Sequence, residues 1–131
     1  MNYKLTILNT YFFLVLIGTI LIKFGRLNFF NISGTYLFAF FSFIPLFILQ
    51  FVSIARFSNK VKRGNPKLFK EACKRPNGTQ GSSINVASLF DENISFDKLK
   101  DKTLLQELDY TKRVVVFSMI SFLVLIILFF I

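Results

Sequence analysis

Residues 5–22 read LTILNTYFFLVLIGTILI, an apolar run of 18 residues without a charged side chain. As a helix this run is roughly 27 Å long, close to the roughly 30 Å of hydrocarbon in a bilayer. A cleaved signal peptide is the alternative interpretation, and Lys4 at its start fits that pattern. The run is longer than the apolar region of a usual signal peptide, and it continues into KFGR without a small-residue cleavage site. We therefore predict that it is retained as a membrane-spanning helix.

Two further apolar runs follow, at residues 29–55 and 114–131. The first of them has the polar letters NISGTY at 31–36, near its start, which favours an interfacial start and a span near residues 35–55. Pro45 inside that span lacks a backbone donor, so we expect it to bend the helix. About six residues, 23–28, separate the first two runs, and a connection that short predicts an antiparallel helical hairpin.

The composition agrees with a membrane protein. Hydrophobic residues make up 53% of the 131 residues and mean hydropathy is +0.57, too apolar for a soluble domain with so much surface. The sequence therefore predicts an all-α integral membrane protein with three transmembrane helices, a helical hairpin and a C-terminal helix, in one membrane domain over residues 1–131.

Residues 58–113 form the long polar loop of this arrangement. It holds all seven acidic residues and twelve of the sixteen Lys and Arg. Asn65 as N-cap and Pro66 at the first helical position predict a short helix that runs to about Lys74. The letters RPNGTQGSS at 75–83 are typical of a turn or loop.

A second helix is expected in the same loop, beginning near Ser95 or Asp97. It would have one apolar face, formed by Leu99, Leu104, Leu105 and Leu108. No helix-breaking residue separates this stretch from the last apolar run, so we expect one uninterrupted helix into the membrane.

The distribution of positive charge predicts the orientation. The short connection has only Lys23 and Arg26, whereas the long loop has twelve basic residues. The positive-inside rule therefore places the loop and the N-terminus in the cytoplasm and the C-terminus outside, in the inner (plasma) membrane of a bacterium. A net charge of +9 would suggest nucleic acid in a soluble protein, but cytoplasmic loops explain it here, and we expect no nucleic-acid partner.

The densest basic stretch is the candidate site for contact with anionic lipid headgroups. Polybasic segments beside a membrane helix attract such headgroups. Leu68, Phe69 and Ala72 on the short helix suit a helix that lies on the membrane surface. The alternative is that the charges only set the topology. The candidate residues are Arg56, Lys60, Lys62, Arg63, Lys67, Lys70, Lys74 and Arg75.

Enzymatic activity, metals and cofactors are not expected. The chain has no His and one Cys, Cys73, which excludes His-based chemistry, a disulfide within the chain and a structural zinc site. Asp97 and Asp101 could resemble a catalytic pair, but the Lys residues between them indicate a solvated helical face. The predicted spans carry no charged residue, which argues against a transporter, pump or proton channel.

The second half of the chain shows a resemblance to a known family. A helix ends in ARFSNKVKRGNPKLFKE, a turn-rich stretch follows, and SFDKLKDKTLLQELDYTKRVVV leads into the last helix. Over residues 55–131 this resembles the bacterial universal stress protein B family of small inner-membrane proteins. The similarity lies in Asn65-Pro66 before Leu68-Phe69, in the aromatic and acidic stretch at 96–101, and in the basic pair before the final helix. The chain differs in its added N-terminal helix and its many Phe residues.

The resemblance implies a general-stress membrane protein without catalytic residues to carry over. Three helices bury little surface, which favours a membrane protein partner or a homo-oligomer. We therefore expect a non-enzymatic, stress-associated or accessory-subunit role in the lipid bilayer. An immunity protein against a pore-forming toxin is the alternative, and a holin is disfavoured because the chain ends in the apolar letters LIILFFI.

Overall fold

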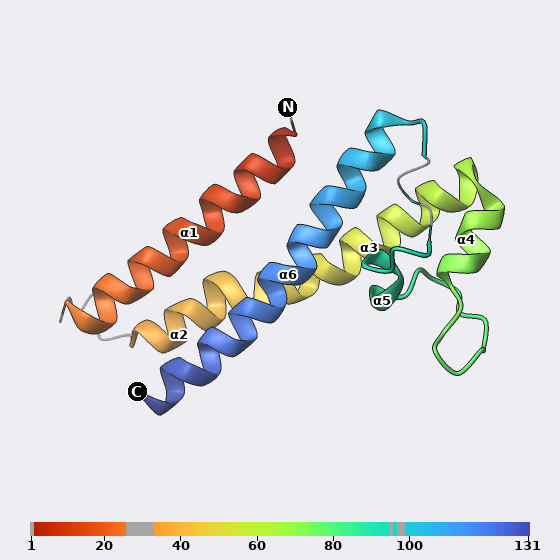
Figure 1. The fold of residues 1–131 in the computed structure, drawn as a ribbon. Helices are drawn as coiled ribbons and strands as arrows, with labels where there is room; N and C mark the ends of the chain where they lie inside the picture. Colours follow the sequence, from red (N-terminus) through yellow and green to blue (C-terminus); the bar gives the residue numbers. More distant parts are fainter. Residues whose placement is uncertain (1, 26–32, 95, 97–98) are drawn as a thin grey trace. The chain divides into compact units, whose positions relative to one another are not determined.

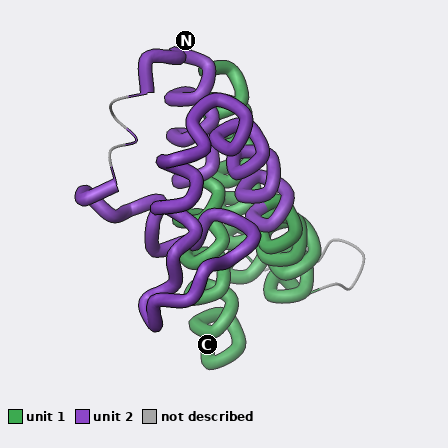
Figure 2. The backbone as a smooth tube through the Cα atoms, turned by 90° about the vertical axis from the view of Figure 1, so that its right-hand side faces the viewer, with its two compact units in different colours: residues 1–49, 114–131 green, residues 50–113 purple. Residues whose placement is uncertain are grey.

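The computed structural model describes residues 2–25, 33–94, 96 and 99–131, and helices make up most of them. They fall into two compact units (Figure 2). Residues 1–49 and 114–131 form the first unit, here the helical bundle, and residues 50–113 form the second, here the basic module.

Among the described residues, three helical runs are long and apolar enough to cross a membrane, which is the number that the sequence predicts (Figure 1). The helix of the second run extends beyond the span predicted near residues 35–55. Helix continues until Gly64, because no breaker occurs before the Asn65-Pro66 pair. The elements of these runs are α1 (Tyr3–Phe24), α2 (Gly34–Phe38), the π-helix η1 (Ala39–Phe43), α3 (Ile44–Gly64) and α6 (Lys102–Phe130).

The register of the bundle follows from its cross-helix contacts. Lys23 of α1 donates to Thr35 of α2, and Tyr11 donates to Phe41 of η1, so these segments are antiparallel, as the short connection predicts. The connection itself lies mostly outside the described residues. The ring of Phe12 stacks on that of Phe117, with centroids 4.2 Å apart, and α6 therefore runs parallel to α1.

Polar side chains join the helices at two levels of the bundle. The hydroxyls of Ser42 and Ser121 are buried and lie 2.9 Å apart, in hydrogen-bond contact. At the end of α6, the Lys23 ammonium donates to the carbonyl of Leu128, which otherwise lacks a partner from its own helix. A cation at this end also interacts favourably with the helix dipole.

Pro45 coincides with a change of helix type. The turn before it is the π-helix η1, in which the N–H of Ile44 donates to the carbonyl of Ala39. In a regular α-helix the carbonyl of Phe41 would accept from residue 45, but proline has no N–H. The Tyr11 hydroxyl of α1 donates to this carbonyl instead.

The basic module has a hydrophobic core of its own. The short helix α4 (Pro66–Ala72) begins as predicted, with the side chain of Asn65 accepting from the N–H of Leu68 at 3.2 Å. It ends at Ala72, two residues before the expected end. A one-turn helix, α5 (Val86–Leu89), was not predicted. Buried side chains from all these segments meet in the core, among them Phe57, Val61, Leu68, Ala72, Ile84, Leu89, Phe96 and Leu108.

The helix α6 crosses from the basic module into the bundle without a break, as expected from the absence of breakers. It begins at Lys102, later than the expected start near Ser95 or Asp97, and Leu99 is therefore not on it, because residues 99–101 are not helical. Asp101 precedes it and accepts from the N–H of Thr103 at 2.9 Å, the contact of an N-cap.

Candidate interaction site on the basic module

The eight candidate basic residues occupy consecutive elements of the module. The end of α3 carries the first four, α4 carries Lys67 and Lys70, and the segment after α4 carries Lys74 and Arg75. All eight are exposed. Some of their charged groups contact other side chains of the module and others do not, so the cluster falls into two groups.

Lys60 is paired with an acidic residue that the sequence did not single out. Its ammonium lies 3.0 Å from a carboxylate oxygen of Glu107, whose side chain is only 9% exposed. A buried carboxylate needs such a partner, because loss of its hydration is costly. Lys60 therefore has a structural task within the module.

Lys62 lies over the ring of Phe69, with its ammonium 5.8 Å from the ring centroid. This is the geometry of a cation–π contact between α3 and α4. Phe69 is half-buried under this contact and does not project freely from α4.

The helix α4 has two different faces. Leu68 and Ala72 are buried in the core of the module, at 6% and 0% exposure. The apolar side chains that sequence reasoning directed at a membrane surface are thus already covered by protein. Lys67, Lys70 and Lys74 remain outside, and Glu71 is the one acidic residue among the eight basic ones.

A tight turn follows α4. The N–H of Gly78 donates to the carbonyl of Arg75, and the N–H of Arg75 donates to the carbonyl of Thr79, each at 2.9 Å. Gly78 has φ +83°, a left-handed conformation that favours glycine. The predicted turn is therefore a small hairpin, closed by an isolated bridge between Lys74 and Gln80.

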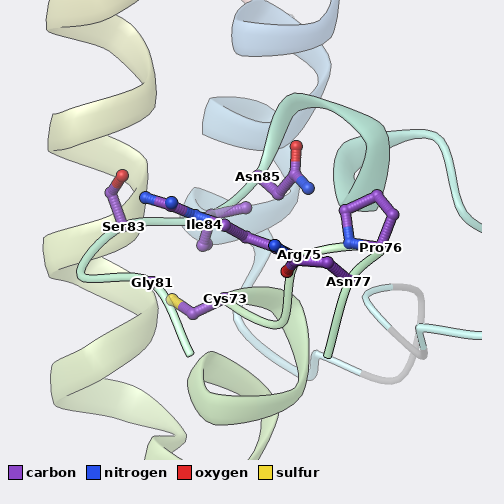
Figure 3. Close-up of a pocket in the computed structure, with 8 residues that line it drawn as sticks. All are labelled: Cys73, Arg75, Pro76, Asn77, Gly81, Ser83, Ile84 and Asn85. Carbon is purple, nitrogen blue, oxygen red and sulfur yellow. The ribbon is translucent and has the colours of Figure 1, made fainter. Parts of the chain in front are cut away.

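The hairpin borders an open pocket of about 510 Å³ (Figure 3). Arg75 extends across it, between Pro76 on one side and Ser83 on the other. Cys73 lines the edge and is buried; burial raises the pKa of its thiol, and the charge of Lys62 offsets part of that rise. A thiol with a raised pKa is a weak nucleophile at neutral pH, which suits a structural residue.

A second open pocket, of about 420 Å³, lies between the end of α3 and the start of α6. Lys60, Arg63 and Asp101 are among the residues that line it. The carboxylate of Asp101 accepts from the hydroxyl and the N–H of Thr103, and these hydrogen bonds lower the pKa of Asp101. This carboxylate therefore caps α6, and Asp97, its suggested partner, lies outside the described residues.

The described residues contain no group of three or more His, Cys, Asp and Glu that could hold a metal ion. Comparisons with known protein families, with curated proteins and with solved structures find no match to this chain.

Proposed function

We propose that the chain is a multi-pass protein of the bacterial inner membrane that acts by binding a partner and catalyses no reaction. The outer surface of the helical bundle carries this proposal. Large apolar side chains of α1 face outward, among them Leu14, Ile17 and Leu21, each more than half exposed. Phe40, Ile48, Leu123 and Phe129 do the same on the other helices. Soluble proteins rarely expose so much contiguous apolar surface, and lipid chains would cover it.

The orientation in this proposal follows the distribution of charge. The basic module lies in the cytoplasm with the N-terminus, and the end of α6 lies outside. Only Lys23 and Arg26 are found between the first two helical runs, so the opposite orientation would place most basic residues on the wrong side.

A binding role is supported by the construction of the basic module. It has its own core and exposes basic side chains on α4 and its hairpin. The resemblance to universal stress protein B-like proteins over residues 55–131 adds a stress-associated setting to this proposal. An accessory subunit of a membrane complex would have the same construction.

Reporter fusions test the orientation. Gly78 at the hairpin tip has no other group within 4 Å of the position a Cβ would take, so an insertion there is tolerated. A fluorescent protein that folds only in the cytoplasm should be bright when inserted after Gly78 and dark when fused after Ile131. Alkaline phosphatase, active only outside, should give the reverse result.

Membrane insertion needs a separate measurement. The unfused chain should stay in the membrane pellet after extraction at alkaline pH, which removes peripheral proteins. Release into the supernatant, or phosphatase activity at Gly78, would contradict the proposal.

The binding role is tested by cross-linking in native membranes. A discrete species larger than the single chain is expected, from a partner or from further copies. Recovery of the monomer alone at every concentration of the cross-linker would exclude a stable partner.

A further inference from the structure

Three lysines on α4 and just after it have ammonium groups that make no contact with the rest of the described fold. Lys67 and Lys70 lie one turn apart on the helix, and Lys74 lies two residues after its last residue. Among the described residues their ammonium groups take part in no hydrogen bond or ion pair, in contrast to Lys60. The positive charges of neighbouring ammonium groups repel one another, so their arrangement favours an anionic ligand.

The opposite face of α4 limits how such a ligand could be bound. Leu68 and Ala72 pack into the core of the module, and Phe69 lies under the ammonium of Lys62. Insertion of α4 into an apolar phase would require the module to open. Any contact through α4 is therefore electrostatic, and salt should weaken it.

The nearest anionic surface is the membrane itself. The helical run Gly34–Gly64 is continuous, and α4 begins two residues after it. Nine residues from the predicted end of the span at Ala55 to Gly64 rise roughly 14 Å, and the headgroup layer occupies roughly 6 Å of that distance. For a helix along the membrane normal, the start of α4 would therefore lie about one Debye length, roughly 8 Å at physiological salt, from the headgroups.

We infer that Lys67, Lys70 and Lys74 bind the anionic phospholipid headgroups of the membrane that holds the chain, without insertion of α4. This inference rests on the proposed function, because it requires the module to lie beside a bilayer. Lys60 and Lys62 take no part, since each already contacts a group of the module.

Energy transfer in nanodiscs tests the inference with the full chain. The donor is attached to Gln80→Cys in a Cys73→Ser background, and the acceptor is attached to lipid headgroups. Position 80 reports on these lysines because its backbone pairs with that of Lys74 in the isolated bridge, a pairing that Gln80→Cys leaves in place. Transfer should be higher in discs that contain phosphatidylglycerol than in phosphatidylcholine discs. The gain should disappear at about 1 M salt, where the Debye length is roughly 3 Å.

Two double variants with equal loss of charge separate a local contact from the overall charge. Lys67→Gln with Lys70→Gln should lower the ratio of docked to undocked module about 30-fold. Lys100→Gln with Lys102→Gln removes the same charge from exposed positions elsewhere in the module and should keep the gain.

Three results would overturn the inference: equal transfer in the two kinds of disc, a gain that survives high salt, or equal losses in both double variants. Equal transfer would leave an acidic protein as the ligand to test next. Failure of the chain to enter discs at all would instead contradict the proposed function, so the two failures can be told apart.

Discussion

The position of a carboxylate on α6 decides its role. Glu107 and Asp109 are two residues apart on this helix, and nothing in the neighbouring sequence distinguishes them. In the structure Glu107 is buried against Lys60, 47 residues away along the chain, whereas Asp109 is exposed. The pair could not be predicted from sequence, because it depends on the contact between α3 and α6 and not on the neighbours of either residue.

Asp101 gives a prediction about pH. Its folded-state pKa is lowered by hydrogen bonds from Thr103, so its contribution to stability is present above the unfolded pKa and is lost as pH falls through the folded pKa. Asp101→Ala should therefore lower the melting temperature of the detergent-solubilised chain at pH 7, with a smaller effect in acid. Asp101→Asn, which keeps a capping oxygen, is the control and should lose less at pH 7. An effect of Asp101→Ala that is the same at every pH would refute the role of the charge.

At the level of elements, the sequence predicts where a helix begins or is disturbed better than it predicts which group replaces a missing hydrogen-bond donor. The Asn65-Pro66 pair correctly indicated the start of α4, because a side-chain acceptor before a proline is a local signal. The same pair also marks the end of α3. Pro45 indicated a disturbed helix, but neither the π-helix nor the donor from α1 could be predicted from the residues around it.

The contact between Tyr11 and the carbonyl of Phe41 can be tested by a double-mutant cycle. Tyr11→Phe should cost about 1 kcal/mol, since it removes one hydrogen bond between membrane helices. In a Pro45→Ala background the cost should be smaller, because residue 45 then has an N–H of its own for this carbonyl. Unfolding by detergent titration, followed by circular dichroism, measures both. Equal costs in the two backgrounds would show that Tyr11 does not replace the missing donor.

At the scale of the whole molecule, hydrophobicity predicts the helices and leaves their register open. The three apolar runs predict the number of long helices, and the short connection predicts that the first two are antiparallel. Which residues face one another depends on small polar contacts such as that of Ser42 with Ser121. Other serines in the same helices could have made an equivalent contact, so the sequence does not predict the pair. The candidate basic residues were likewise identified from sequence, but their division into paired and unpaired groups was not.

Disulfide trapping tests the register in the membrane. In a Cys73→Ser background, Ser42→Cys with Ser121→Cys should form an intramolecular disulfide on mild oxidation, because the two hydroxyls lie 2.9 Å apart. The measurement is a shift in gel mobility that a reductant reverses. Ser42→Cys with Met119→Cys is the control, since Met119 is exposed on α6 and should react poorly. Equal reaction of both pairs would contradict the register.

The basic module interrupts the bundle in sequence, since it lies between two segments that pack together. Because residues 50–113 form a compact unit of their own, evolution could lengthen, shorten or replace this insert while the contacts of Ser42, Lys23 and Phe12 persist. Descendants of a common ancestor should therefore differ most in length between α3 and α6. Their ancestry would be easier to recognise in the spacing of a few small polar residues within apolar helices than in the basic module.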